Sequence, residues 1–107
     1  MSDTNEIVVV ASMNVRPELR DEVRTALLRQ VVRVHNEEPG AQLFAAHETE
    51  EGFVLIEKWD SAASLEAHVA GEAIAQYRSV LGPALTEPSQ IQRMSPLPAG
   101  DRGKGAL

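Results

Sequence analysis

Residues 53–59 read Phe-Val-Leu-Ile-Glu-Lys-Trp and predict a β-strand whose first four positions are apolar on both faces. Glu50-Glu51-Gly52 precedes this strand as a predicted hairpin turn, and residues 42–48 predict the partner strand. Successive side chains of a strand point to opposite faces, so a sheet with one wet face alternates apolar and polar residues. The strand at 53–59 breaks that alternation, and we therefore expect both faces of its sheet to be covered.

Two further strands are predicted near the ends of the chain. Ile7-Val8-Val9-Val10-Ala11 is a β-branched run, again apolar on both faces, and predicts a strand that continues to about Asn14. Residues 90–94 predict a weak last strand. Pro88 lies just before it and suggests a position at the edge of the sheet.

Two helical regions separate these strands. The first is expected to begin at residues 16–18, because proline is favoured at the first helical position, and to end near Glu38. Its apolar stripe has helical spacing and consists of Leu19, Val23, Leu27, Val31 and Val34. The second region is expected to run from a Ser61 cap to Gly82-Pro83, with an interruption at Gly71.

The resulting order, β-α-β-β-α-β, is the ferredoxin-like arrangement of an α+β domain. It places both helical regions on one face of a four-stranded antiparallel sheet. We expect one such domain over residues 7–94. Residues 1–6 are expected to form a flexible N-terminus. The Pro- and Gly-rich residues 95–107 are expected to be a loose tail or an arm lying on a partner.

Two helical regions can cover only one face of this sheet. If the other face were open, it would expose an apolar patch on the order of several hundred Å². An isologous dimer, sheet against sheet, is the commonest solution, so we expect a homodimer. The alternative is that the two apolar runs reflect β-propensity in a monomer with a tolerant surface.

The composition argues against several classes of partner. The net charge of −6 over 107 residues is unfavourable for binding nucleic acid or anionic lipid. Without cysteine, the chain cannot form disulfides, thiolate nucleophiles or cysteine metal sites. No apolar run approaches the roughly 20 residues of a membrane span. Residues 1–6 lack the basic region of a signal peptide, so a cytoplasmic protein is expected.

Several short motifs together resemble those of one family. In chain order they are Val15-Arg16-Pro17 after the valine-rich strand, Glu38-Pro39-Gly40, Phe44, residues 53–59 with Ser61, and Leu65-Glu66-Ala67-His68. Over roughly residues 7–94, their order and spacing resemble the antibiotic biosynthesis monooxygenase family of small dimeric α+β barrel proteins.

This resemblance implies a homodimer whose two sheets form a barrel, with a pocket in each subunit between sheet and helices. Some members oxidise phenolic polycycles or quinols with dioxygen and need no metal or flavin. Haem-degrading relatives use a histidine where this chain has Arg78, and an early-strand asparagine where it has valine. Haem chemistry is therefore not expected, and no cofactor is expected.

His68 is the candidate catalytic residue, expected on the helix that follows residues 53–59. Histidine changes its charge near neutral pH, so it can accept a substrate proton. A phenol must lose that proton before its ring is electron-rich enough to react with oxygen. The alternative is a half-buried structural histidine bonded to a backbone carbonyl. The base role rests on the resemblance.

The candidate substrate-binding residues are Trp59, Phe44, Tyr77 and Glu57. The aromatic side chains could line a pocket for a planar ligand, and the Tyr77 hydroxyl could hold a substrate oxygen; the alternative for each is a place in the core. Glu57 could accept a proton or orient His68, or instead pair with an arginine or lie at the solvated end of its strand. No two histidines have close metal-ligand spacing, so no metal site is expected.

Three functions remain open from the sequence. The first is a cofactor-independent monooxygenase-like enzyme that oxidises a small aromatic, phenolic or quinol substrate with dioxygen. The second is an isomerase or degrader of a small polar metabolite in the same pocket, which should be more polar than these aromatic residues suggest. The third is a small-ligand-binding or stress-response protein without turnover, whose ligand would raise the melting temperature and remain unchanged.

Overall fold

The structure, a computed structural model, describes residues 5–107. The first four residues of the expected flexible N-terminus lie outside the described residues. The elements in chain order are β1 (Ile7–Asn14), a 3₁₀ turn (Pro17–Leu19), α1 (Arg20–Glu37), β2 (Ala41–Glu48), β3 (Gly52–Trp59), α2 (Ala62–Val69), α3 (Glu72–Ala84) and β4 (Gln90–Met94). The predicted order is confirmed, with the second helical region divided at Gly71 into α2 and α3.

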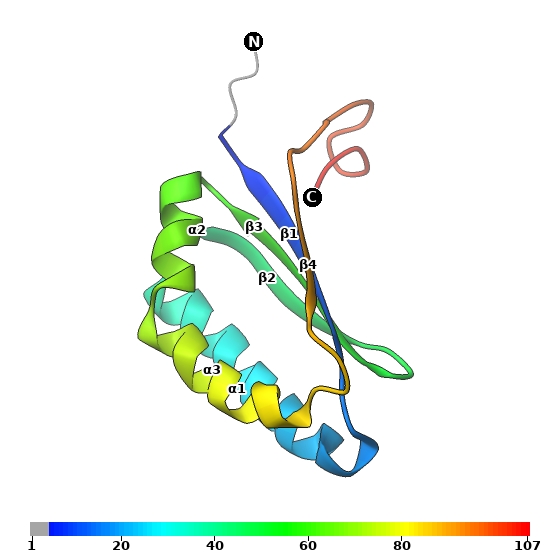
Figure 1. Cartoon of the computed structure of the whole chain (residues 1–107). Coiled ribbons are helices and arrows are strands. Elements are labelled where there is room, and N and C mark those ends of the chain that lie inside the picture. Colours follow the sequence, from blue (N-terminus) through cyan, green and yellow to red (C-terminus); the bar gives the residue numbers. More distant parts are fainter. Residues whose placement is uncertain (1–4) are drawn as a thin grey trace.

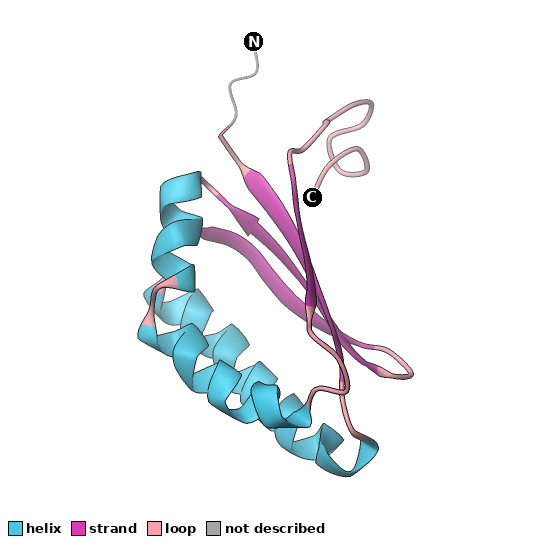
Figure 2. Ribbon diagram, viewed as in Figure 1, coloured by secondary structure: helices cyan, strands magenta, loops and turns pink. Residues whose placement is uncertain are grey.

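The four strands form one antiparallel sheet in the order β2-β3-β1-β4. The helices lie together on one side of it, as Figures 1 and 2 show. This is the expected α+β, ferredoxin-like fold. The edge position predicted for residues 90–94 is also confirmed, since β4 pairs only with β1 and all five of its residues are exposed.

The predicted apolar stripe of the first helix faces the sheet. Val23, Leu27 and Val34 are at most 1% exposed, while Leu19 and Val31 pack against the core from its margin. The start of this region differs from the prediction. The chain first makes a 3₁₀ turn, and the regular α-helix begins only at Arg20. The helix that follows β3 begins as predicted, because the Ser61 hydroxyl accepts the backbone N–H of Ser64 at 3.1 Å.

The inner face of the sheet forms the other half of the core. Phe53, Leu55 and Trp59 of β3 are buried against the helices, as are Val9 and Met13 of β1. Strand alternation places the intervening side chains on the outer face, where no described helix lies. The half-buried apolar side chains of that outer face include Val10, Leu43, Ala45, Val54 and Ile56. The prediction of strands that are apolar on both faces is therefore confirmed.

Residues 95–107 contain no strand and no α-helix, and most of them are exposed. Leu97 is 90% exposed and Leu107 62% exposed. The Lys58 ammonium on the outer side of β3 donates to the backbone oxygen of Leu107 at 2.6 Å, so the tail turns back toward the sheet. Among residues 5–107, no helix is long and apolar enough to cross a membrane.

Candidate functional site

A cavity of about 200 Å³ lies between the inner face of the sheet and the helices. Its apolar walls come from the four strands and from α2 and α3, and they include Val9, Ala11, Met13, Leu55, Leu65 and Leu81. Its polar side chains are Gln30, Glu57, His68, Tyr77, Arg78, Ser89 and Arg93. Four of the five candidate site residues line this one cavity: His68, Phe44, Tyr77 and Glu57.

His68 is held at the cavity wall by a carboxylate. It lies near the end of α2, is 4% exposed, and its Nδ1 is 2.7 Å from Oε1 of Glu38. Because a carboxylate only accepts hydrogen bonds, Nδ1 carries the proton in this contact. The other ring nitrogen, Nε2, has no hydrogen-bond partner within residues 5–107. This geometry leaves Nε2 as the proton acceptor, so the expected alternative of a bond to a backbone carbonyl is not what is found.

Aromatic rings enclose the imidazole. The centroid of Trp59 lies 4.7 Å from that of His68, and the centroid of Phe44 lies 5.5 Å from it. Phe44 also lines the cavity, whereas Trp59 does not. Trp59 is fully buried behind His68, where it supports the imidazole. Its predicted place in the aromatic wall of the pocket is therefore not found in this structure.

Glu57 is buried on the inner face of β3. Neither of the two alternatives expected for it, an arginine partner or a place at the solvated end of the strand, is observed. It is 5% exposed, so it does not lie at a solvated strand end, and it pairs with no arginine of the described residues. Its Oε1 accepts the indole N–H of Trp59 at 2.8 Å. Burial raises the pKa of the Glu57 carboxyl, and the Trp59 hydrogen bond and the nearby His68 only partly oppose that rise.

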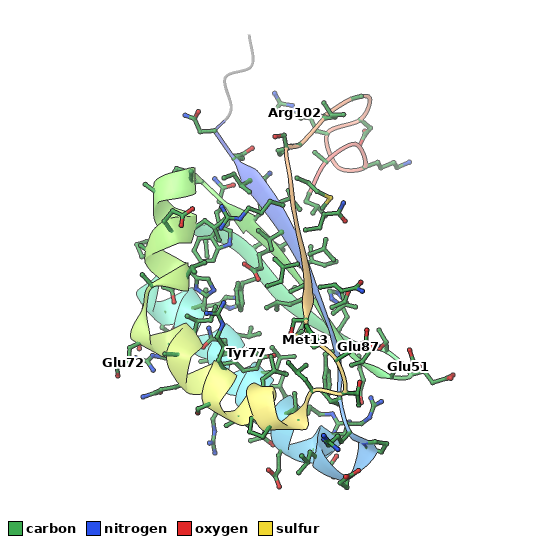
Figure 3. All side chains as sticks on the ribbon, in the orientation of Figure 1. Met13, Glu51, Glu72, Tyr77, Glu87 and Arg102 are labelled. Carbon is green, nitrogen blue, oxygen red and sulfur yellow. The ribbon has the colours of Figure 1, made fainter. Side chains whose placement is uncertain are left out.

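Tyr77 extends from α3 into the layer between the helices and the sheet. Figure 3 shows it across from Met13 of β1, and its hydroxyl donates to the Met13 sulfur at 2.9 Å. Burial, and next the charge of Glu57, raise the pKa of the Tyr77 phenol. The hydroxyl therefore stays protonated at neutral pH, and it can exchange its weak sulfur acceptor for a ligand oxygen.

Two important residues of the site were not predicted from the sequence. Glu38 belongs to the turn before β2, and its contact with His68 spans 30 positions of the chain. Gln30 could have been identified from the sequence, because it falls on the buried stripe of α1 between Leu27 and Val34. A polar residue at such a position is unusual unless it has a partner.

The described residues contain no group of three or more side chains that could hold a metal ion. The three histidines lie in separate environments. The His35 ring bonds the backbone oxygen of Phe44 at 2.9 Å, and His47 is exposed on β2. The chemistry that this site can offer on its own is proton transfer at His68 inside an apolar enclosure.

One comparison with known proteins identifies a family. The model of the antibiotic biosynthesis monooxygenase family matches residues 6–80. No curated protein matches the chain. Among solved structures, the Mycobacterium tuberculosis protein Rv0793 is 26% identical with a TM-score of 0.80, over 90% of this chain and 99% of that one.

Two further solved structures are described as candidate antibiotic biosynthesis monooxygenases. The one from Caulobacter crescentus is 24% identical with a TM-score of 0.79, over 85% of this chain and 89% of that one. The one from Bacteroides thetaiotaomicron is 18% identical with a TM-score of 0.81, over 92% of this chain and 95% of that one. At these identities the two structures show likeness of fold.

Proposed function

The chain belongs to the antibiotic biosynthesis monooxygenase family, and we propose that it oxidises a small phenolic or quinol-like aromatic compound with dioxygen, without a cofactor. One observation carries the proposal. His68 lines an apolar cavity with Nδ1 held by Glu38, so that Nε2 is the nitrogen available to take a proton. A histidine oriented by a carboxylate is arranged as a general base.

The cavity suits a compact, largely apolar substrate. Aromatic and aliphatic side chains form most of its wall. The aromatic ones are Phe44 of β2 and Tyr77 of α3. Its volume of about 200 Å³ is below the roughly 300–1,000 Å³ of common ligand pockets, which favours a compound of one or two rings. An apolar wall of this kind favours a phenol over the polar metabolite of the alternative hypothesis.

The reaction can be written for a phenol with hydrogen on its para carbon. His68 Nε2 takes the hydroxyl proton, and the electron-rich para carbon then forms a C–O bond with dioxygen. The imidazolium returns its proton to the peroxide oxygen, which gives a C–OOH group. Loss of water breaks the O–O bond, removes the ring hydrogen from that carbon and leaves a carbonyl. One oxygen atom enters the quinone, and the other leaves as water.

Oxygen uptake with a panel of small phenols, hydroquinones and an anthrone tests this function. In the presence of a metal chelator, we expect consumption of one dioxygen per substrate without release of hydrogen peroxide. Reactions without protein measure spontaneous oxidation. If the chain raises its melting temperature with these compounds but leaves all of them unchanged, it is a binding protein and the enzymatic proposal is wrong.

Glu38 is proposed as a positioning residue that acts through His68. Glu38→Gln keeps an oxygen that can accept from Nδ1 but removes the charge, and its N–H₂ group can turn toward the ring instead. We expect kcat to fall about 10- to 100-fold with KM little changed, in line with the loss of a group that orients a histidine. Steady-state kinetics would measure both parameters.

The matched control for this variant is Glu37→Gln. Glu37 is the preceding residue, but it is exposed and pairs with Arg33 at 3.0 Å. Its variant should keep wild-type kinetics. A Glu38→Gln enzyme that retained full kcat would show that the carboxylate has no part in catalysis.

We further propose that the protein is a homodimer in which a second copy covers the outer face of the sheet. The apolar outer side chains of β1, β2 and β3 support this, since no described helix covers them. The exposed Leu97 and Leu107 make the tail suitable as an arm that lies on the partner.

A further inference from the structure

The mouth of the cavity opens between the edge strand β4 and the helices α2 and α3. The lining residues that are exposed define it, since the residues of the floor are buried. Val69 and Arg78 belong to the helix side of the mouth, while Ile91 and Arg93 belong to β4. The mouth is therefore an apolar rim with a guanidinium on each side.

Within residues 5–107, only one of the two guanidinium groups at this mouth has a charged partner. Arg78 makes no ion pair or hydrogen bond with any residue of 5–107. Arg93 contacts Glu66 at 3.1 Å, but both side chains are about half exposed, and an exposed pair of this kind is weak and easily exchanged. Among the described residues that line the cavity, the only carboxyl is that of the deeply buried Glu57. In a chain with a net charge of −6, this opening is thus locally suited to an anion.

One of the buried residues that line the cavity carries an unsatisfied donor. Gln30 is 4% exposed, and its Nε2 has no hydrogen-bond partner among the described residues. A buried amide donor without a partner is unfavourable, and few such groups occur in folded proteins. Since Gln30 lines the cavity, an acceptor oxygen of a bound ligand can supply the missing partner.

We propose that the cavity binds a small aromatic carboxylate that also carries a ring hydroxyl or carbonyl oxygen. The carboxylate binds at the mouth to Arg78 and Arg93, because the planar guanidinium fork matches a carboxylate. The ring packs among the apolar residues of the wall, and the ring oxygen accepts from Gln30. This inference names the substrate class of the proposed function and rests on that function for the location of the site.

Calorimetric titration of the full chain compares two ligands that differ in one group. These are 4-hydroxyphenylacetate, which has the carboxylate, and 2-(4-hydroxyphenyl)ethanol, which has a neutral hydroxyl in its place. We expect the carboxylate to bind at least about tenfold more tightly at low salt, and this difference to shrink as salt is added. Equal affinities would overturn the proposal.

Arg78→Gln tests the mouth directly. Arg78 is exposed, so folding of the variant should be unaffected. The variant should lose the roughly tenfold preference for 4-hydroxyphenylacetate over the neutral alcohol, while it binds the alcohol as the wild type does. Arg102→Gln is the matched control, because it removes the same charge from the tail, which does not line the cavity. If both variants changed the preference equally, the effect would come from net charge and the proposed contact would be wrong.

Gln30→Leu tests the inner end with a second pair of ligands. Wild-type protein should prefer 4-hydroxyphenylacetate to phenylacetate, and the variant should lose that preference. Leucine has a similar volume and needs no partner, so the melting temperature should be maintained. A preference that survived in the variant would remove Gln30 from the site.

These titrations do not require turnover, which separates the inference from the proposed function. If the ligand preferences hold and no compound of the oxygen-uptake panel is oxidised, the binding proposal stands and the enzymatic one fails. If phenols are oxidised without any preference for the carboxylate, the function stands and the proposed substrate class is wrong.

Discussion

His68→Gln should lower kcat/KM for phenol or quinol oxidation by about 100-fold or more, the range typical for loss of a general base. Glutamine has a similar size and polarity, but its amide cannot take up a proton at neutral pH. The variant should still fold, since its amide can donate to Glu38 in place of Nδ1. Oxygen uptake under saturating and limiting substrate would measure kcat and kcat/KM separately.

The control for this experiment is His47→Gln. His47 is exposed on β2 and does not line the cavity, so its variant should keep wild-type activity. Ligand titration of His68→Gln should show affinity within a few-fold of the wild type, which would place the loss in the chemical step. Full turnover by His68→Gln would remove the base role and, with it, the observation on which the proposed function rests.

Ile56→Asp should convert the proposed homodimer into a monomer. Ile56 lies on the outer face of β3 and is paired with Val10 of β1 and Ala45 of β2, so it is near the middle of the apolar surface. Two-fold symmetry would bury one new carboxylate in each copy, without a partner, at the same interface. Such a change should raise the dissociation constant at least about 100-fold, because an unpaired buried charge is strongly unfavourable.

Sedimentation equilibrium at low micromolar concentration would measure this effect. The wild-type chain should show about twice the subunit mass of 11.6 kDa, and the variant the single mass. Leu28→Asp is the matched control. Leu28 is 53% exposed on α1, so this substitution introduces the same charge on the opposite side of the molecule. A wild-type mass of 11.6 kDa would show that the outer face remains open to solvent.

Much of the fold could be predicted because it depends on local patterns. The spacing of Val23, Leu27 and Val34 matches the period of a helix and identifies the face that the sheet covers. The run at residues 53–56 departs from strand alternation, and the structure shows apolar side chains on both faces of β3. A residue's own neighbours in the chain were sufficient for these predictions.

The candidate site was predictable only in part. His68, Phe44 and Tyr77 do line one cavity, but Trp59 lies behind the imidazole in the core, which was the alternative left open for it. Pairing with an arginine was one alternative for the candidate substrate-binding residue Glu57, and the residue instead accepts the Trp59 indole N–H in a buried position. An isolated glutamate in an apolar strand carries no information about which of these partners it meets.

The sequence alone determined the order of the elements, the buried face of the first helix, and the presence of a second apolar sheet face. These follow from periodicity, which needs only the spacing of residues along the chain. Only the tertiary structure decided that Glu38 contacts His68, and that Gln30 and Arg78 belong to the same cavity. Those contacts join residues of different elements, and their distances depend on how helices pack against the sheet, which no local pattern records.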